Sequence, residues 1–383
     1  MSQKEYAEDT VFWSIKRATQ FSARRRTVHL FFADAPEGCK TEYQFIDNTN
    51  AVFQEVKDLF EKHQPRSIVL NVDPDIAFAG GLHVGMYNEL IQQLGPKWSA
   101  RFIEAPMVAV EYIATMPSPQ LEWYKRLQET TWAMISDAFS AKVITPSKTT
   151  TEDVEWWLRD KVQAMNYSTW FQPAVNILHI NSGDHTGSEP PPGRKDIQYR
   201  DILHVDFGVT ALGLNTDTQH LAYVLGPGQT SDKIPQGLKD GLKNMNRLQD
   251  IVRENMIVGK TGNEILHSIE DQMKDESIRG KIYCHPIGDW GHAAGAPIGM
   301  INLQDGVPVL GDLPLLSHTY YSVELYAEHF VPEMNGTVNF YQEEDVFWVE
   351  ENRWDWVYGQ QTEFLVIDSD SDLDIEGGLR VQL

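Results

Sequence analysis

Short apolar runs alternate with stretches of helical spacing along the first 117 residues. The β-forming residues at 27–33 and 67–72 predict two buried strands. Apolar residues recur at helical spacing over 50–63 and 87–94, which predicts two helices. Strands that alternate with helices favour a small layered α/β domain. Pro117 and Pro119 interrupt regular structure, so we expect a first domain at 1–117 and a second at 118–383.

The second domain is expected to be mixed α+β. A long helix is predicted from about 120 to 141. Clusters of β-forming residues predict strands at 202–209, 221–225, 319–325, 345–349 and 362–367. Three consecutive prolines within 188–193 predict a surface loop.

A repeated motif suggests that this second domain is duplicated. The segment Lys148-Thr-Thr-Thr-Glu152 is similar to Lys260-Thr-Gly-Asn-Glu264, which lies 112 residues later. In each segment a Thr is followed three residues later by Glu, the pattern of a capping box at the start of a helix. The pair indicates two similar half-domains, with chance repetition as the alternative.

Composition narrows the class of protein. Of 383 residues, 42% are hydrophobic, which is typical of a globular chain with a substantial core. A net charge of −23 argues against nucleic acid as a partner, because such a surface repels phosphates. There is no apolar run long enough for a membrane span and no secretory signal pattern. With only two cysteines, Cys39 and Cys284, a reducing cytoplasm is the expected location.

The excess of acidic residues has two readings. Part of it lies in residues 368–376, which are expected to form a solvated tail. Another part could be carboxylates gathered around cations. Asp206 interrupts an apolar strand, and Asp217 follows eleven residues later, where a hairpin could bring both carboxylates to one point. The alternative is that each aspartate caps the backbone at a strand end or turn.

Further candidate ligands follow towards the C-terminus. His285 and His292 lie seven residues apart in a glycine-rich segment, and neutral imidazole is a common ligand of transition metals. Glu324 and Glu363 each stand within a predicted apolar strand. Either glutamate could instead point outward from a half-exposed strand.

Taken in order, Asp206, Asp217, His285, Glu324 and Glu363 resemble the metal ligands of the pita-bread metallopeptidase family. Asp206-Phe-Gly208 resembles its Asp-x-Gly strand, and His285-Pro-Ile-Gly288 resembles its His-x-Ile-Gly segment. The resemblance spans about residue 120 to the C-terminus. It implies a pita-bread fold of duplicated half-domains, preceded here by a small α/β domain like that of Xaa-Pro aminopeptidases, prolidases and creatinase.

The resemblance also implies a mechanism. Two divalent ions would be bound, Mn²⁺ foremost, with Co²⁺, Zn²⁺ or Fe²⁺ as alternatives. A hydroxide bridging them would attack a carbonyl, Glu324 would transfer the proton, and His292 would stabilise the oxyanion. His179 resembles a substrate-side histidine, with His185 as its rival. The family further implies a short peptide or small amide substrate and a homodimer.

Departures from the family pattern leave the substrate open. Gln361 stands where an arginine is usual two residues before the last glutamate, and Lys281 stands where a histidine is usual. The usual Asp-x-Thr-Arg is Asp217-Thr-Gln-His220 here. An Xaa-Pro aminopeptidase or dipeptidase is the leading interpretation. The alternatives are a hydrolase of a non-peptide small amide or other small molecule and a catalytically silent binding protein.

Trp156, Trp157 and Trp170 line a pocket or fill the core, and the core is favoured.

Overall fold

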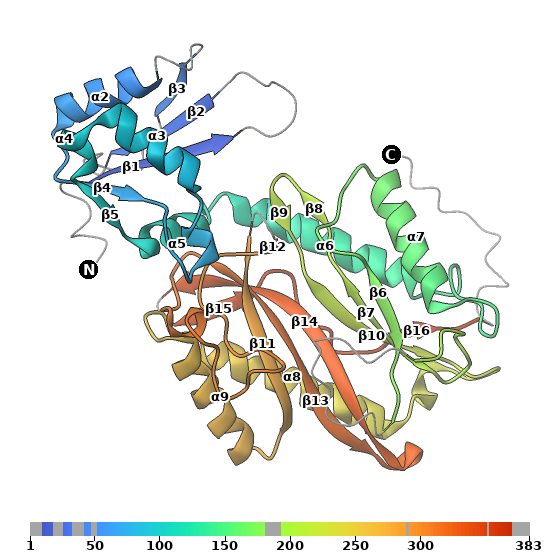
Figure 1. Cartoon of the computed structure of the whole chain (residues 1–383). Coiled ribbons are helices and arrows are strands. Elements are labelled where there is room, and N and C mark those ends of the chain that lie inside the picture. The colour runs from blue at the N-terminus through green and yellow to red at the C-terminus, as the bar shows by residue number, and fades with distance from the viewer. Residues whose placement is uncertain are drawn as a thin grey trace. The chain divides into compact units, whose positions relative to one another are not determined.

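The computed structural model describes residues 10–17, 26–32, 42–46, 52–180, 193–288, 291–350 and 352–369. The chain divides into two compact units, Met1–Tyr112 and Ile113–Leu383. Each unit has its own sheet and helices (Figure 1). None of the helices in the described residues combines the length and apolar character needed to cross a bilayer.

The first unit contains a five-stranded mixed sheet in the order β3-β2-β1-β4-β5. Its described strands are β1 (Thr10–Arg17), β2 (Arg26–Phe32), β3 (Glu42–Ile46), β4 (Ser67–Leu70) and β5 (Phe102–Glu104). Its described helices are α2 (Val52–His63), α3 (Val84–Leu94), α4 (Pro96–Ser99) and α5 (Pro106–Ala114). Val56 and Phe60 of α2 pack with Ile68 of β4 and Trp98 in one buried core. The expected α/β architecture of this part is confirmed.

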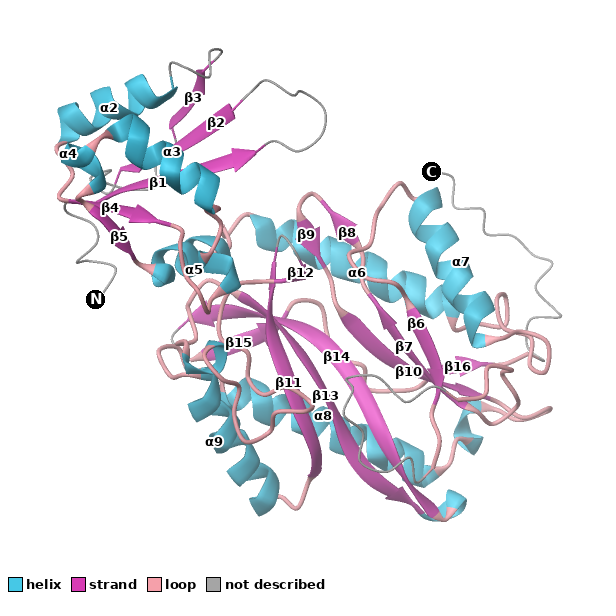
Figure 2. Cartoon of the chain, viewed as in Figure 1, coloured by secondary structure: helices cyan, strands magenta, loops and turns pink. Residues whose placement is uncertain are grey.

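The second unit is built on a curled, mainly antiparallel sheet with the order β12-β11-β13-β14-β10-β7-β6 (Figure 2). Off this path, β15 pairs with β14, and β16 pairs with β10. The strands are β6 (Ala174–Ile177), β7 (Ile202–Phe207), β10 (Thr218–Val224), β11 (Arg279–Gly288), β12 (Gly291–His292), β13 (Tyr320–Val331), β14 (Gly336–Glu350), β15 (Arg353–Trp356) and β16 (Leu365–Ile367). A small pair, β8 (Thr210–Ala211) and β9 (Leu214–Asn215), lies between β7 and β10.

Two helix pairs divide this sheet into similar halves. α6 (Gln120–Ala138) and α7 (Thr151–Ala164) share a core with β6, β7 and β10, whereas α8 (Gln236–Asn255) and α9 (Gly262–Asp275) share another with β11, β13 and β14. In α8 the buried Leu238, Leu242 and Met245 recur at helical spacing and bind the helix to the sheet. Each half therefore consists of two helices followed by antiparallel strands, as expected for duplicated half-domains.

Both repeated segments begin a helix, but the N-cap of the first differs by one residue from the prediction. The second helix, α9, is capped by Thr261 with Glu264, as predicted. The first is capped by Thr150 with Asp153, not by Thr149 with Glu152. Three consecutive threonines stand at the start of α7, so the sequence alone does not decide which of them is the N-cap. Both ends have a complete capping box, which satisfies N–H groups that the helix leaves unpaired.

Two other predicted segments are the strand at 362–367 and the loop at 188–193. The expected strand at 362–367 is shorter, because β16 begins only at Leu365. Glu363 therefore does not stand within a strand. The surface loop predicted at 188–193 lies almost wholly outside the described residues, as does His185.

Candidate metal centre

A row of paired polar residues crosses five neighbouring strands of the sheet. Asp206 on β7 pairs with Gln219 on β10, and Gln219 pairs with Glu343 on β14. Glu343 pairs with Glu324 on β13, which in turn pairs with Tyr283 on β11. Directly paired residues place their side chains on the same face at close range. Three acidic residues far apart in the sequence therefore converge.

A second polar row runs beside the first, two residues away from it on β14, β13 and β11. Asp345 pairs with Ser322, and Ser322 pairs with His285. Side chains two residues apart on a strand share one face, so both rows point the same way. Asp217 directly precedes β10, and its backbone N–H donates to Asp345 Oδ2 at 3.2 Å. The antiparallel return from β7 to β10 thus brings Asp217 close to Asp206, as a hairpin was expected to do.

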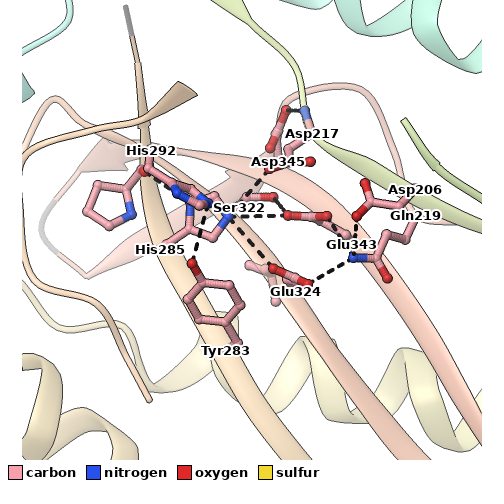
Figure 3. Close-up of polar contacts among 12 residues, drawn as sticks. Asp206, Asp217, Gln219, Tyr283, His285, His292, Ser322, Glu324, Glu343 and Asp345 are labelled. Carbon is pink, nitrogen blue, oxygen red and sulfur yellow. Dashed lines mark hydrogen bonds and ion pairs between the residues drawn. The ribbon is translucent and has the colours of Figure 1, made fainter. Parts of the chain in front are cut away.

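The imidazole of His285 lies among three carboxylates (Figure 3). Its Nε2 atom is 3.4 Å from Asp217 Oδ2, 3.4 Å from Glu343 Oε1 and 3.9 Å from Glu324 Oε2. A second group joins Asp206, Asp217 and Glu343, whose ligand atoms lie within 4.8 Å of one another. Asp217 and Glu343 belong both to the group around His285 and to the group with Asp206, so the geometry offers two adjacent positions for a cation.

Burying these carboxylates in charged form costs desolvation free energy, which positive charge or protons must offset. Asp217 and Glu324 are each 4% exposed, and Glu343 is 1% exposed. Burial, followed by repulsion from Glu343 and Asp206, raises the pKa of Asp217 well above its usual range. Burial raises the pKa of the neighbouring Asp345 in the same way. Such a cluster must hold protons or cations at neutral pH.

The hydrogen bonding of His285 favours a cation. Its Nδ1 atom is 3.1 Å from the carbonyl oxygen of Pro286, which can only accept, so Nδ1 carries the proton in the neutral ring. The lone pair of Nε2 then faces carboxylate oxygens, and Nε2 has no hydrogen-bond partner in the described residues. A lone pair directed at negative oxygens is unfavourable unless a proton or a cation lies between them. A backbone acceptor at the far nitrogen is also the usual support of a metal-binding histidine.

One predicted ligand, Glu363, does not join the acidic cluster, and Glu343 lies there instead. Glu363 is exposed and belongs to none of the candidate groups found among the described residues. Glu343 is the carboxylate that joins Asp206, Asp217, His285 and Glu324. Glu343 opens a run of three acidic residues inside β14, a costly placement that could have been noticed in the sequence. The predicted strand began two residues too late to include it.

Two histidines predicted at the site lie differently. His292 on β12 is exposed, yet its ring contacts those of His285 and Trp170, whose centroids lie 4.3 and 5.1 Å away. Desolvation and repulsion by His285 lower the pKa of His292 to about 4, so the ring is neutral. Tyr283 Oη lies 3.3 Å from its Nε2. His179 is exposed just after β6 and is in none of the groups near His285 within the described chain.

His220 and Gln361 are two residues at which the sequence departs from the family pattern, and their side chains lie on the face of the sheet opposite the acidic rows. His220 Nε2 is 2.9 Å from Glu344 Oε1, and both side chains are buried. The Gln361 amide binds the backbone N–H and C=O of Leu221. Two residues before Glu343 stands Tyr341, so the arginine that is usual in the family is absent at that position as well.

Solved structures with a similar fold were found, although no family model matches the sequence and no curated protein is significantly similar to it. An X-Pro aminopeptidase from Thermotoga maritima shares 14% identity over 95% of this chain and 99% of that chain, with a TM-score of 0.63. An Xaa-Pro dipeptidase from Bacillus anthracis shares 15% identity over 95% and 98%, with a TM-score of 0.55. A dipeptidase from Pyrococcus horikoshii shares 14% over 95% and 97%, with a TM-score of 0.54.

The chain has the pita-bread fold. The resemblance found in the sequence is thereby confirmed at the level of fold, including the α/β unit that precedes the duplicated half-domains. The matches extend over almost the whole length of both chains, so neither unit lacks a counterpart in these relatives. Within this pita-bread fold, the two polar rows lie on the strands of both halves, where the halves meet in the sheet.

Proposed function

We propose that this chain is a metal-dependent hydrolase that releases the N-terminal residue of short peptides, with Xaa-Pro peptides as its preferred substrates. The observation that carries the proposal is the position of His285 Nε2 among Asp217, Glu343 and Glu324. The names of similar solved structures, which are X-Pro aminopeptidases and Xaa-Pro dipeptidases, support the substrate class.

The donor set suits hard divalent transition metals. Asp206, Asp217, His285, Glu324 and Glu343 would hold two ions, whose four positive charges balance four carboxylates and make burial tolerable. Oxygen-rich surroundings with one imidazole favour Mn²⁺, with Co²⁺, Zn²⁺ and Fe²⁺ as alternatives. When bound, such ions activate water and polarise a carbonyl group.

Side chains of this protein would carry the protons. Glu324 would accept a proton from the attacking water and pass it to the leaving amine. His292, neutral because its pKa is lowered to about 4, would donate a hydrogen bond to the oxygen that becomes negative. Burial and the charge of Glu324 raise the pKa of Tyr283, which keeps its hydroxyl protonated beside His292.

A hydrolase of a small non-peptide amide is the second candidate. Gln219 and His220 depart from the usual family residues beside Asp217, and Gln219 enters the acidic cluster directly. A changed side chain at this point favours a changed substrate. The choice of Mn²⁺, a cytoplasmic location and a homodimer remain predictions.

A substrate panel tests the proposal. The metal-stripped chain, restored with each of the four metals, is assayed on Xaa-Pro dipeptides, Xaa-Pro-Yaa tripeptides, matched peptides with alanine for proline, and small amides. We expect metal-dependent release of the N-terminal residue from proline peptides and none from Asp217→Ala. Cleavage of small amides alone would favour the second candidate. Metal binding without any cleavage would indicate a binding protein and contradict the proposal.

A further inference from the structure

Asp345 is a buried carboxylate that the proposed reaction does not use. It lies on β14, two residues after Glu343, and is 1% exposed. Three donors meet at one of its oxygens. Oδ2 accepts from Tyr124 Oη at 2.7 Å, from Gln128 Nε2 at 2.9 Å and from the Asp217 backbone N–H at 3.2 Å (Figure 3). The third donor belongs to a candidate metal ligand, so Asp345 joins that ligand to two side chains outside the acidic rows.

These two side chains belong to a polar stripe on helix α6. Tyr124, Gln128 and Thr131 stand at positions i, i+4 and i+7, so they share one face of the helix. All three are at most 1% exposed. Burying a hydroxyl or an amide costs free energy unless it is hydrogen-bonded, and an apolar stripe would bind the helix to the sheet without that cost. The polar stripe therefore indicates a role beyond helix packing.

The stripe reaches the short segment that carries the Asp217 carboxylate. Thr131 Oγ1 lies 2.8 Å from Thr216 Oγ1, on one side of this aspartate. On its other side, Thr218 Oγ1 donates to Gln128 Oε1 at 3.3 Å. The Gln128 amide has a fixed orientation, because its oxygen accepts from a hydroxyl while its nitrogen donates to a carboxylate. Three consecutive residues are thus held by α6, either directly or through the carboxylate on β14.

The direction of the Asp217 side chain matters to both candidate cation positions. It belongs to one group that contains His285 and to another that contains Asp206 and Glu343. An aspartate has only two side-chain torsions, so its carboxylate follows the position of its backbone closely. Binding groups must be held to within about 0.5 Å of the productive geometry, which requires support from the residues around them.

We propose that Asp345 is a positioning residue that fixes the backbone of Asp217 and so the direction of the ligand that both cation positions share. Tyr124 and Gln128 hold Asp345 in place. Helix α6 therefore belongs to the metal centre, although it contributes none of the candidate ligands found in the described residues. This inference rests on the proposed function, because it takes Asp217 to bind metal. It deepens that proposal by naming the residues that support the shared ligand.

Calorimetric titration of the metal-stripped full chain with Mn²⁺ tests this assignment without any substrate. Asp345→Leu keeps the approximate shape of the side chain and removes the acceptor, so Mn²⁺ affinity should fall by ~10–100-fold, the usual effect of losing a ligand's supporting partner. Asp345→Asn keeps an oxygen acceptor for the same donors and should recover most of the loss, to within ~3-fold of wild type. Gln128→Met removes one donor and should weaken binding by ~10-fold, which provides a second test if Asp345→Leu folds poorly.

Gln249→Met is the matched control for Gln128→Met. Gln249 is a fully buried glutamine on α8, the helix that corresponds to α6 in the other half. Its Nε2 donates to Val323 O and its Oε1 accepts from Gln360, and neither residue is one of the candidate ligands. Its affinity for Mn²⁺ should match wild type.

The titrations separate this assignment from the proposed function. Wild-type affinity in both Asp345→Leu and Gln128→Met would overturn the assignment and leave the metal centre intact. An equal loss in Gln249→Met would also overturn it, because the loss of any buried helix amide would then suffice. A loss in Asp345→Asn as large as that in Asp345→Leu would mean that the charge acts rather than the anchoring, which contradicts a positioning role. An absence of binding in wild type would overturn the proposed function itself.

Discussion

Glu343 Oε1 lies 3.4 Å from His285 Nε2, although strand β13 runs between the strands that carry them. Strands separated by a third lie about 9–10 Å apart, so both side chains must reach across β13. The small Ser322 on β13 pairs with His285 and donates to Glu343 Oε1 at 2.6 Å. This arrangement brings a histidine and a glutamate from non-neighbouring strands to one point.

Glu343 rather than Glu363 should therefore be needed for metal binding. Glu343→Gln is expected to lower metal affinity by more than ~100-fold, beyond what the loss of a supporting partner costs a metal site. Glu363→Gln is the matched control and should bind metal like wild type, because its side chain is exposed. Calorimetry on both purified variants checks this. Equal loss in both variants would restore Glu363 as a ligand.

Metal binding should also stabilise the second unit. An ion at about 100 times its Kd adds about 2.7 kcal/mol to the free energy of unfolding. For a unit of this size, the melting temperature should rise by roughly 5–10 °C. The measurement is a thermal unfolding scan with and without added Mn²⁺. Asp217→Ala should show no such shift, and an equal shift in that variant would indicate binding elsewhere.

His292 is expected to act on catalysis without holding the metal. His292→Ala should lower kcat by ~100-fold or more, the usual effect of removing a donor to a developing oxyanion. Its metal content should equal that of wild type. His318→Ala, which removes another exposed histidine, is the control and should leave kcat unchanged. If His292→Ala instead loses metal, the imidazole is a ligand, as its closeness to Asp217 and His285 would allow.

The helix caps offer a test of local stability. Thr150→Ala and Thr261→Ala should each lower the free energy of unfolding by about 1 kcal/mol. Denaturant unfolding curves measure this. Glu152→Gln should have little effect, whereas Asp153→Asn should destabilise, because Asp153 accepts from the Thr150 backbone N–H.

The same cap has a predictable pH dependence. Hydrogen bonds from Thr150 lower the pKa of Asp153 in the folded chain. A lowered pKa means that the stabilisation is present above the unfolded value of about 4 and is lost as pH falls through the folded value. Between pH 6 and pH 3 the stability difference between wild type and Asp153→Asn should therefore shrink. A constant difference would contradict this origin.

The sequence predicts most of this fold because its patterns are local. Strand and helix signals need only neighbouring residues, and the capping box at Thr261 is readable from four letters. The cap at Thr150 was misplaced by one residue, because three threonines offer the same hydroxyl and only the three-dimensional start of α7 selects one.

The candidate site could be predicted only in part. Asp206, Asp217, His285 and Glu324, which the sequence predicts from their type and order, do lie together. Glu343 was missed because the choice depends on sheet register: Glu343 shares the face of Glu324, whereas its neighbour Glu344 points to the other face. A shift of one residue reverses every side chain on a strand. The contact between Gln219 and the carboxylates depends on the same register and has no signal in the sequence alone.

The central claim is that these five side chains hold divalent ions, and elemental analysis of the purified chain tests it most directly. After saturation with Mn²⁺ and removal of free metal, wild type is predicted to retain about two ions per chain. Asp217→Ala should retain none above background. Wild type with no more bound metal than Asp217→Ala would contradict the account.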